Sequence, residues 1–324
     1  MAGTGGGDQA FRRDALLGRE VEPTWSGALS FLRRCYTRTL DSVDVVVSGI
    51  PFDAAVTYRP GCRLGPRAIR AASVQLAELS AFPWGFDPFD TLAVVDHGDL
   101  VLDPHHPSSM PEAIEAHARR IIDSGARMLT LGGDHFISYP LLRAHAAMHG
   151  PLALIQLDAH SDTWTDDGHG VDHGTMFARA VNEGLVDAGR STQIGLRTYN
   201  RDDAGFEILT APWVHRNGIA AALDVARQRA GDAPVYLTFD IDVLDPAFAP
   251  GTGTPVPGGL ATWQALEFVR GLTGLSMIGM DIVEVSPPFD HAEVTALAAA
   301  HVAHDWLCVL AADAGASAVP VGRL

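Results

Sequence analysis

The sequence predicts a three-layer α/β/α fold with a mostly parallel central sheet. Short apolar runs alternate with stretches of helical spacing almost throughout the 324 residues. Parallel neighbouring strands need such crossover connections, so this alternation indicates a parallel sheet with helices on both faces. The runs are rich in β-branched and aliphatic residues, which is typical of strands buried on both sides. A hydrophobic content of 47% is enough to fill a sizeable core.

Seven apolar runs are predicted as strands, and three stretches are singled out as helices. The strands cover residues 43–50, 91–95, 127–131, 152–157, 193–196, 235–239 and 275–280. The helices cover residues 65–79, 111–124 and 262–270. Pro66 suits the first turn of its helix, because the N–H that proline lacks would be unpaired there. Thr262 is predicted as the N-cap of the last helix.

The chain is predicted to form one domain. No repeat and no Pro/Ser-rich or charged linker divides it after its N-terminal end. We therefore expect a disordered N-terminal tail over residues 1–12 and a single domain over residues 13–324. The tail is Gly-rich and polar, unlike a secretory signal, and no run of about 18 uninterrupted apolar residues could span a bilayer. A cytoplasmic location is expected.

The charge and the cysteines narrow the range of partners. The formal net charge is −16, which disfavours nucleic acid and anionic membrane surfaces and favours small cations. Cys35, Cys62 and Cys308 are scattered and form no C-x-x-C pair. Neither a disulfide framework nor a thiolate metal site is therefore indicated. We expect a small cationic ligand, with no nucleic-acid or membrane partner.

Four of the apolar runs are followed by polar residues that can bind a metal or a cation. These are His135 after 127–131, Asp158, His160 and Asp162 after 152–157, Asp240 and Asp242 after 235–239, and Glu284 beyond 275–280. The carboxyl ends of parallel strands line one crevice, where ligands bind in this architecture. Side chains two apart in an extended segment also point to the same face, so these residues are expected to converge.

Two imidazoles and four carboxylates make a hard, oxygen-rich ligand set. Such a set suits Mn²⁺ or a similar divalent ion better than it suits a structural zinc, which thiolates would bind. Six ligands are too many for one ion with an open position, whereas two ions about 3.5–4 Å apart could share bridging aspartates and activate a water molecule. A single Asp-x-Asp or Gly-Gly-Asp-His segment is more often a turn or a helix cap. Three such segments after three buried strands favour a binuclear site.

Three segments resemble the motifs of the ureohydrolases, the family that includes arginase and agmatinase. They are residues 132–135, 158–162 and 239–246, and residues 249–255 match the segment that follows the third motif. The resemblance extends over nearly the full length and is closest to the bacterial agmatinases. It implies an arginase-like fold, a hydrolase that releases urea from a guanidino compound, and a homo-oligomer, commonly a trimer or a hexamer.

The resemblance also implies a role for each site residue. One Mn²⁺ would be bound by His135, Asp158, Asp162 and Asp240, and the other by Asp158, His160, Asp240 and Asp242, so that Asp158 and Asp240 bridge. His173 matches the family histidine that moves protons, and Glu284 matches the glutamate that pairs with the guanidinium. A histidine can indeed protonate a departing amine, and a carboxylate can bind a guanidinium bidentately. A surface histidine and a solvated glutamate are the alternatives. Asp162 would orient the attacking water.

Agmatine, which would be cleaved to putrescine and urea in polyamine biosynthesis, is the expected substrate. Asp166, Asp167 and Asp172 lie in a short acidic segment and favour a substrate with a cationic far end, although a solvated loop is the alternative. In contrast, the loop containing Arg59 and Arg63 resembles that of enzymes acting on guanidino acids. These arginines could pair with a substrate carboxylate or could simply hold a loop or a subunit contact.

Other substrates and other classes of protein remain as alternatives. The alternative substrates are 4-guanidinobutyrate, 3-guanidinopropionate or a proclavaminate-like compound. A metal-dependent deacetylase or amidase has a related sheet, but it resembles a single-zinc site with fewer ligands. A non-catalytic homologue would have no physical reason to keep every ligand together with His173 and Glu284. Both of these classes are disfavoured.

Overall fold

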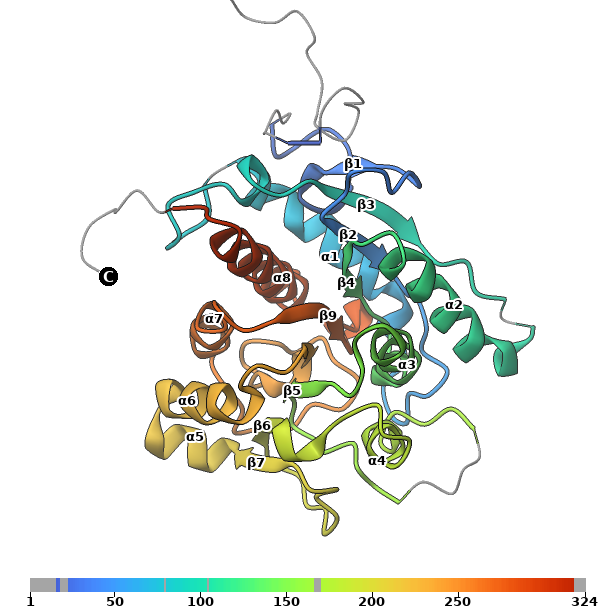
Figure 1. Cartoon of the computed structure of the whole chain (residues 1–324), viewed down its shortest axis with the longest axis vertical. Coiled ribbons are helices and arrows are strands. Elements are labelled where there is room, and N and C mark those ends of the chain that lie inside the picture. Colours follow the sequence, from blue (N-terminus) through green and yellow to red (C-terminus); the bar gives the residue numbers. More distant parts are fainter. Residues whose placement is uncertain (1–15, 18–22, 79, 104, 166–169, 318–324) are drawn as a thin grey trace, which may run out of the picture.

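The fold is built around one parallel sheet (Figure 1). The structure, a computed structural model, describes residues 16–17, 23–78, 80–103, 105–165 and 170–317. The predicted tail, residues 1–12, lies outside this part of the chain. Every strand pair is parallel, and helices cover the sheet. The predicted fold class is therefore confirmed.

Within the described residues, nine strands make up the sheet in the order β1-β3-β2-β4-β9-β8-β5-β6-β7. Their bounds are β1 Cys35–Tyr36, β2 Val45–Gly49, β3 Val94–Asp99, β4 Arg127–Leu131, β5 Ala153–Leu157, β6 Thr192–Leu196, β7 Glu207–Thr210, β8 Val235–Asp240 and β9 Met277–Val283. The four strands that precede the predicted site residues, β4, β9, β8 and β5, are neighbours in the middle of the sheet. Their carboxyl ends therefore meet.

All seven predicted strands are present, and two short edge strands were not predicted. β1 has only two residues, and β7 has no continuous buried run. β3 continues beyond its predicted end through Asp96 and His97, because these buried polar side chains find partners inside the protein. Asp96, for example, accepts two hydrogen bonds from Arg70. Hydrophobic pattern alone does not detect such a strand end.

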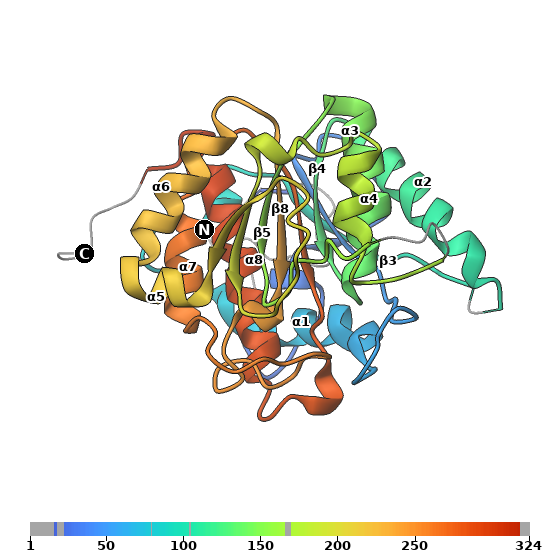
Figure 2. The ribbon, with the colours of Figure 1, turned by 90° about the horizontal axis from the view of Figure 1, so that it is seen from below.

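Helices cover both faces of the sheet and give the predicted three layers (Figure 2). One face carries α2 Met110–Ile122, α3 Ser138–His149 and α4 Met176–Asn182. The other face carries α1 Gly65–Ser73, α5 Ala211–Asn217, α6 Ile219–Ala230, α7 Thr262–Arg270 and α8 Val294–Asp313. Alternate residues of β2 belong to different cores, since Val45 and Val47 pack on one face and Val46 on the other. This two-sided burial explains the continuous apolar runs.

Two details of the predicted helices were wrong. The helix predicted over residues 65–79 ends as α-helix at Ser73 and continues as a 3₁₀ segment over Val74–Glu78. The N-cap of α7 is Ala261 rather than Thr262. The backbone N–H of Ala261 donates to the Gln264 side chain at 3.0 Å, so a glutamine in the first turn supplies the cap interaction.

The longest helix, α8, is apolar on nearly all sides. Its length and composition would suffice to cross a membrane, and in the part of the chain that the structure describes it is the one helix with this property. However, 83% of its apolar window is buried inside the protein. It packs against α1 and α7, so its place in the core accounts for its composition.

Candidate metal centre

The same local turn follows three of the central strands. In each case an aspartate side chain accepts the backbone N–H two residues later. The pairs are Asp134 with Phe136 at 3.1 Å, Asp158 with His160 at 2.6 Å, and Asp240 with Asp242 at 2.8 Å. These aspartate turns end the strands and direct the following side chains into the crevice. Convergence therefore comes from turns rather than from the predicted alternation of extended residues, and Asp162 even has a left-handed backbone with φ 51°.

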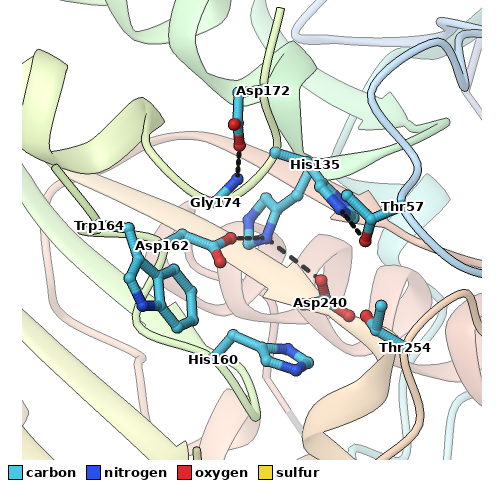
Figure 3. A pocket seen from close by; sticks show the side chains of 10 residues that line it. Thr57, His135, His160, Asp162, Trp164, Asp172, Gly174, Asp240 and Thr254 are labelled. Atoms are coloured by element: carbon cyan, nitrogen blue, oxygen red, sulfur yellow. Dashed lines mark hydrogen bonds and ion pairs between the residues drawn. The ribbon is translucent and has the colours of Figure 1, made fainter. Parts of the chain in front are cut away.

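One cluster forms around the buried imidazole of His135 (Figure 3). Its Nδ1 lies 3.0 Å from Oδ2 of Asp158, 2.9 Å from Oδ2 of Asp162 and 3.2 Å from Oδ2 of Asp240. These residues come from the ends of β4, β5 and β8. The structure thus brings together four side chains that the sequence places up to 105 residues apart, from His135 to Asp240.

A second cluster shares Asp158 with the first. His160 Nδ1 lies 3.4 Å from Oδ1 of Asp158 and 3.0 Å from Oδ2 of Asp242. Asp158, His160 and Asp242 are close enough to hold one ion, as are His135, Asp158 and Asp240. Asp158 therefore lies between the two clusters, whereas these distances place Asp240 in the first cluster only.

The first cluster fits a divalent cation. His135 Nε2 is hydrogen-bonded to Thr238 Oγ1 at 2.8 Å, whereas its buried Nδ1 has no hydrogen-bond partner despite the three nearby carboxylates. Ligand atoms about 3 Å apart match the edges of an octahedron with metal–ligand bonds of about 2.1 Å. A cation would satisfy this nitrogen and the carboxylates together.

The electrostatics also indicate excess negative charge. Burial and the neighbouring carboxylates raise the pKa of Asp240 well above its usual range, and that of Asp162 to about 6. Burial would lower the pKa of His160, but the charges of Asp242 and Asp158 raise it to about 12. Raised carboxyl pKa values mean that the ionised forms are disfavoured without a cation, and a bound cation would favour them.

His173 and Glu284 form a pair beside the first cluster. His173 Nδ1 donates to Glu284 Oε1 at 2.9 Å, and its Nε2 lies 3.1 Å from Thr57 Oγ1. Burial would lower the His173 pKa, but the hydrogen bond and charge of Glu284 raise it to about 9. Glu284 Oε1 also accepts the backbone N–H of His135 at 2.9 Å, while its buried Oε2 has no partner. The histidine is therefore protonated near neutral pH.

A cavity of about 260 Å³ opens above these residues (Figure 3). Its walls are Thr57, His135, His160, Asp162, Trp164, Asp172, His173, Gly174, Asp240 and Thr254. His173 is on the wall, whereas Glu284 is almost completely buried and lies behind it. Asp166 and Asp167 lie outside the described residues.

Four wall residues, Thr57, Trp164, Gly174 and Thr254, were not predicted from the sequence. Thr57 contacts His173, and the Thr254 hydroxyl donates to Asp242 Oδ2 at 3.2 Å. Trp164 donates its backbone N–H to the Gly174 carbonyl at 3.0 Å, which closes the base of the acidic segment. Trp164 follows the motif at residues 158–162, and Thr254 lies in the matching segment 249–255. Their closeness to these motifs could have identified them as site residues. Thr57 is far from the motifs, and the signal for it was its place in the loop of Arg59 and Arg63, which resembles a loop of related enzymes.

The two arginines considered for a guanidino acid do not line the cavity. The Arg63 guanidinium is paired with the buried carboxylate of Asp53, with Nε 2.5 Å from Oδ1. The Arg59 guanidinium lies 5.1 Å from the Tyr58 ring centre and 5.2 Å from that of Phe289. Both arginines therefore already have partners within the protein.

A parallel α/β sheet that gathers histidines and aspartates at its carboxyl edge is the architecture of a metal-dependent enzyme. The model of the Arginase family matches residues 43–308. The chain belongs to the arginase family, and it is a ureohydrolase similar to the agmatinases.

Relatives of known name support this assignment. An agmatinase of Chromobacterium violaceum is 58% identical over 306 residues, which cover 94% of this chain and 95% of the relative. A crystal structure described as a hypothetical agmatinase from Burkholderia thailandensis has a TM-score of 0.93 and 59% identity, covering 94% of this chain and 98% of that one. Proclavaminate amidino hydrolase from Streptomyces clavuligerus has a TM-score of 0.85 and 37% identity, covering 90% and 100% respectively.

Proposed function

We propose that this ureohydrolase cleaves agmatine to putrescine and urea. The observation that carries the proposal is the charge of the cavity wall. Asp162, Asp172 and Asp240 lie on it, and no arginine or lysine is among the described residues that line it. Agmatine is cationic at both ends, and Asp172, the wall carboxylate outside the proposed ligand set, is available to attract one of them. The relatives named agmatinase support the same substrate.

A guanidino acid is the second candidate. The likeness to proclavaminate amidino hydrolase, which has a TM-score of 0.85, favours it. Its carboxylate would need a cationic partner, and Arg59 and Arg63 are engaged with aromatic rings and with Asp53. Binding such a substrate would break these contacts, so agmatine is the better fit. The ureohydrolase assignment leaves the deacetylase and the non-catalytic homologue without support.

We propose that two Mn²⁺ ions bind the clustered side chains. His135, Asp158, Asp162 and Asp240 would hold the first ion, and Asp158, His160 and Asp242 would hold the second. The family resemblance adds Asp240 to the second ion as well, although Asp240 lies close to His135 in the first cluster. When bound, a pair of divalent ions supplies a nucleophilic water near neutral pH. The oxygen-rich ligand set favours Mn²⁺.

The surrounding side chains would position the reactants and move protons. Asp162 accepts a hydrogen bond from the attacking water and so orients it toward the guanidinium carbon. His173 lies on the cavity wall, where Glu284 raises its pKa, so its imidazolium can donate a proton to the departing amine. Glu284 Oε2, which has no partner, can accept a guanidinium N–H once the substrate reaches it.

Several broader expectations remain predictions. These are the homo-oligomer, as a trimer or a hexamer, the cytoplasmic location, and the division into a tail of residues 1–12 and a domain of residues 13–324.

A urea-release assay tests the substrate. The Mn²⁺-loaded protein is compared on agmatine, 4-guanidinobutyrate, 3-guanidinopropionate and arginine. We expect kcat/KM for agmatine to exceed the others by about 100-fold or more, equivalent to about 2.7 kcal/mol of transition-state discrimination. Turnover of only a guanidino acid would show that the substrate is wrong while the site stands. No urea from any of the four would overturn the proposed function.

A further inference from the structure

A second buried carboxylate lies directly behind the first cluster. Asp281 in β9 is fully buried and is the register partner of Thr238 in β8. Three hydroxyl groups donate to it. Thr238 Oγ1 lies 2.6 Å from Oδ1, while Ser138 Oγ and Tyr236 Oη lie 2.8 Å and 2.9 Å from Oδ2. Asp281 is not a wall residue of the cavity and touches none of the reactants.

These contacts determine where the protons lie. A carboxylate can only accept hydrogen bonds, so the single hydroxyl proton of Thr238 points to Asp281. Thr238 Oγ1 is then an acceptor for His135, whose Nε2 is 2.8 Å away. His135 must therefore carry a proton on Nε2, which leaves Nδ1, the nitrogen that faces the three carboxylates of the first cluster, as the one that can offer a lone pair to a cation.

We propose that Asp281, acting through Thr238, holds His135 in the tautomer and orientation that bind a cation through Nδ1. Asp281 and Thr238 are thus positioning residues. The inference rests on the proposed metal centre. Partners behind a ligating histidine orient its ring and raise its basicity, and their loss typically weakens metal binding about 10–100-fold. His160 in the second cluster has no described hydrogen-bond partner on Nε2, so the effect belongs to the first ion.

We call the path of hydrogen bonds from His135 through Thr238 to Asp281 the relay. Replacement of Thr238 tests it. Thr238→Val keeps the shape of the side chain and removes the hydroxyl, whereas Thr238→Ser keeps the hydroxyl. Mn²⁺ is titrated against a chelating dye to obtain Kd at each site, and electron paramagnetic resonance at two equivalents reports the exchange-coupled ion pair. We expect Thr238→Val to weaken one of the two sites about 10–100-fold and to lose the coupled signal. Thr238→Ser should remain within about threefold of the wild type.

Tyr236→Phe is the matched control. It also removes a hydroxyl donor of Asp281 but leaves the path from Oδ1 through Thr238 to His135 intact. It should therefore bind Mn²⁺ like the wild type. Should Thr238→Val fail to fold by circular dichroism, Asp281→Asn replaces it, because the neutral amide weakens the relay without changing the shape. An unchanged Kd in that variant, too, would count against the relay.

Two outcomes separate this inference from the metal centre itself. Equal Mn²⁺ affinity in Thr238→Val and Thr238→Ser would overturn the relay. His135→Asn is measured in parallel, and it should lose one ion. If His135→Asn binds two Mn²⁺ like the wild type, the proposed metal centre fails as well. If only His135→Asn loses an ion, the centre stands and the relay is wrong.

Discussion

The carboxyl edge of the sheet carries two groups of buried and partly buried acidic side chains, and an arginine neutralises one of them. Beside β3, Arg70 contacts Asp96 at 2.8 Å and Asp99 at 2.5 Å. At the ends of β4, β5 and β8, no arginine side chain pairs with the described aspartates of the metal centre, whose charged partners are histidines. A buried carboxylate that is paired with an arginine, such as Asp96, contributes to the fold. Carboxylates that lack a cationic partner, as around His135 Nδ1, need a bound cation to neutralise their charge.

Histidines near the two groups respond in opposite directions. Near β3, burial and the neighbouring charges of His97, Arg120 and Arg38 lower the pKa of His117 to about 4. At the metal centre, Glu284 raises the pKa of His173 to about 9 despite burial. Burial is the larger cause at His117 and cationic neighbours add to it, whereas a carboxylate outweighs burial at His173. The following predictions test this contrast, beginning with the largest expected effect.

Loss of a carboxylate from the metal centre should affect activity most. Asp242→Asn removes a charged ligand of the second ion, so we expect about one ion fewer per chain. The cation contributes several kcal/mol of transition-state stabilisation, and kcat/KM should therefore fall about 1000-fold. Metal analysis and the urea assay check both effects. A variant with full metal content and full activity would show that Asp242 is not a ligand.

Loss of the arginine from the other group should affect stability instead. Arg70→Met leaves the buried Asp96 without its cation, which should cost about 3–5 kcal/mol in the free energy of unfolding. Denaturant unfolding measures this change, and kcat per folded molecule should stay unchanged. The double variant Arg70→Met/Asp96→Asn is the control and should recover part of the loss. A mild effect in the single variant would contradict the structural role of the pair.

Metal removal should distinguish the two groups in one protein. Mn²⁺ at about 100 times its Kd stabilises a protein that binds it only when folded by about 2.7 kcal/mol. We expect chelation to lower the free energy of unfolding by about this amount. The destabilisation by Arg70→Met should be the same with and without Mn²⁺, because distant sites add. Stability that does not respond to the chelator would argue against the metal centre.

Acid should destabilise the protein through His117. Its folded pKa is about 4, below the ordinary value of 6.5. The unfolded chain therefore binds the proton first, and stability falls as pH decreases from 6.5 toward 4. His117→Gln retains a side-chain amide near Ser48, whose Oγ lies 2.8 Å from Nε2, but does not titrate. Urea unfolding of the metal-free proteins at pH 7 and pH 5 should show a smaller pH effect in the variant. Equal pH dependence would contradict the shift.

The smallest effect is expected at the cavity rim. Asp172→Asn keeps the carbonyl that accepts the Gly174 N–H at 2.7 Å but removes the negative charge. An exposed ion pair contributes up to about 1 kcal/mol, so KM for agmatine should rise about fivefold. KM for 4-guanidinobutyrate, which lacks the terminal cation, should not rise. Equal changes for both substrates would mean that Asp172 does not recognise the amine.

Much of the site was predictable because the signals are local. An apolar strand pattern followed by Asp-x-His-x-Asp or Asp-x-Asp identifies the ligand residues at the end of that strand. This identification needs no information from other parts of the chain. The aspartate turns were not predicted. The same residues can form an extended segment or a turn in which the aspartate side chain accepts the backbone N–H two residues later, and the sequence pattern does not distinguish the two conformations. Thr57 was also missed, because it reaches His173 from a loop distant in sequence.

By itself the sequence determined the three-layer class, the seven main strands and the side chains that gather at their carboxyl ends, because these depend on periodicity and on strand direction. Only the tertiary structure decided that β9 and β8 lie between β4 and β5, that Arg63 is held by Asp53 and that Asp281 stands behind His135 through Thr238. Those choices depend on which distant segments pack together, and no local pattern encodes a neighbour that is brought in from elsewhere in the chain.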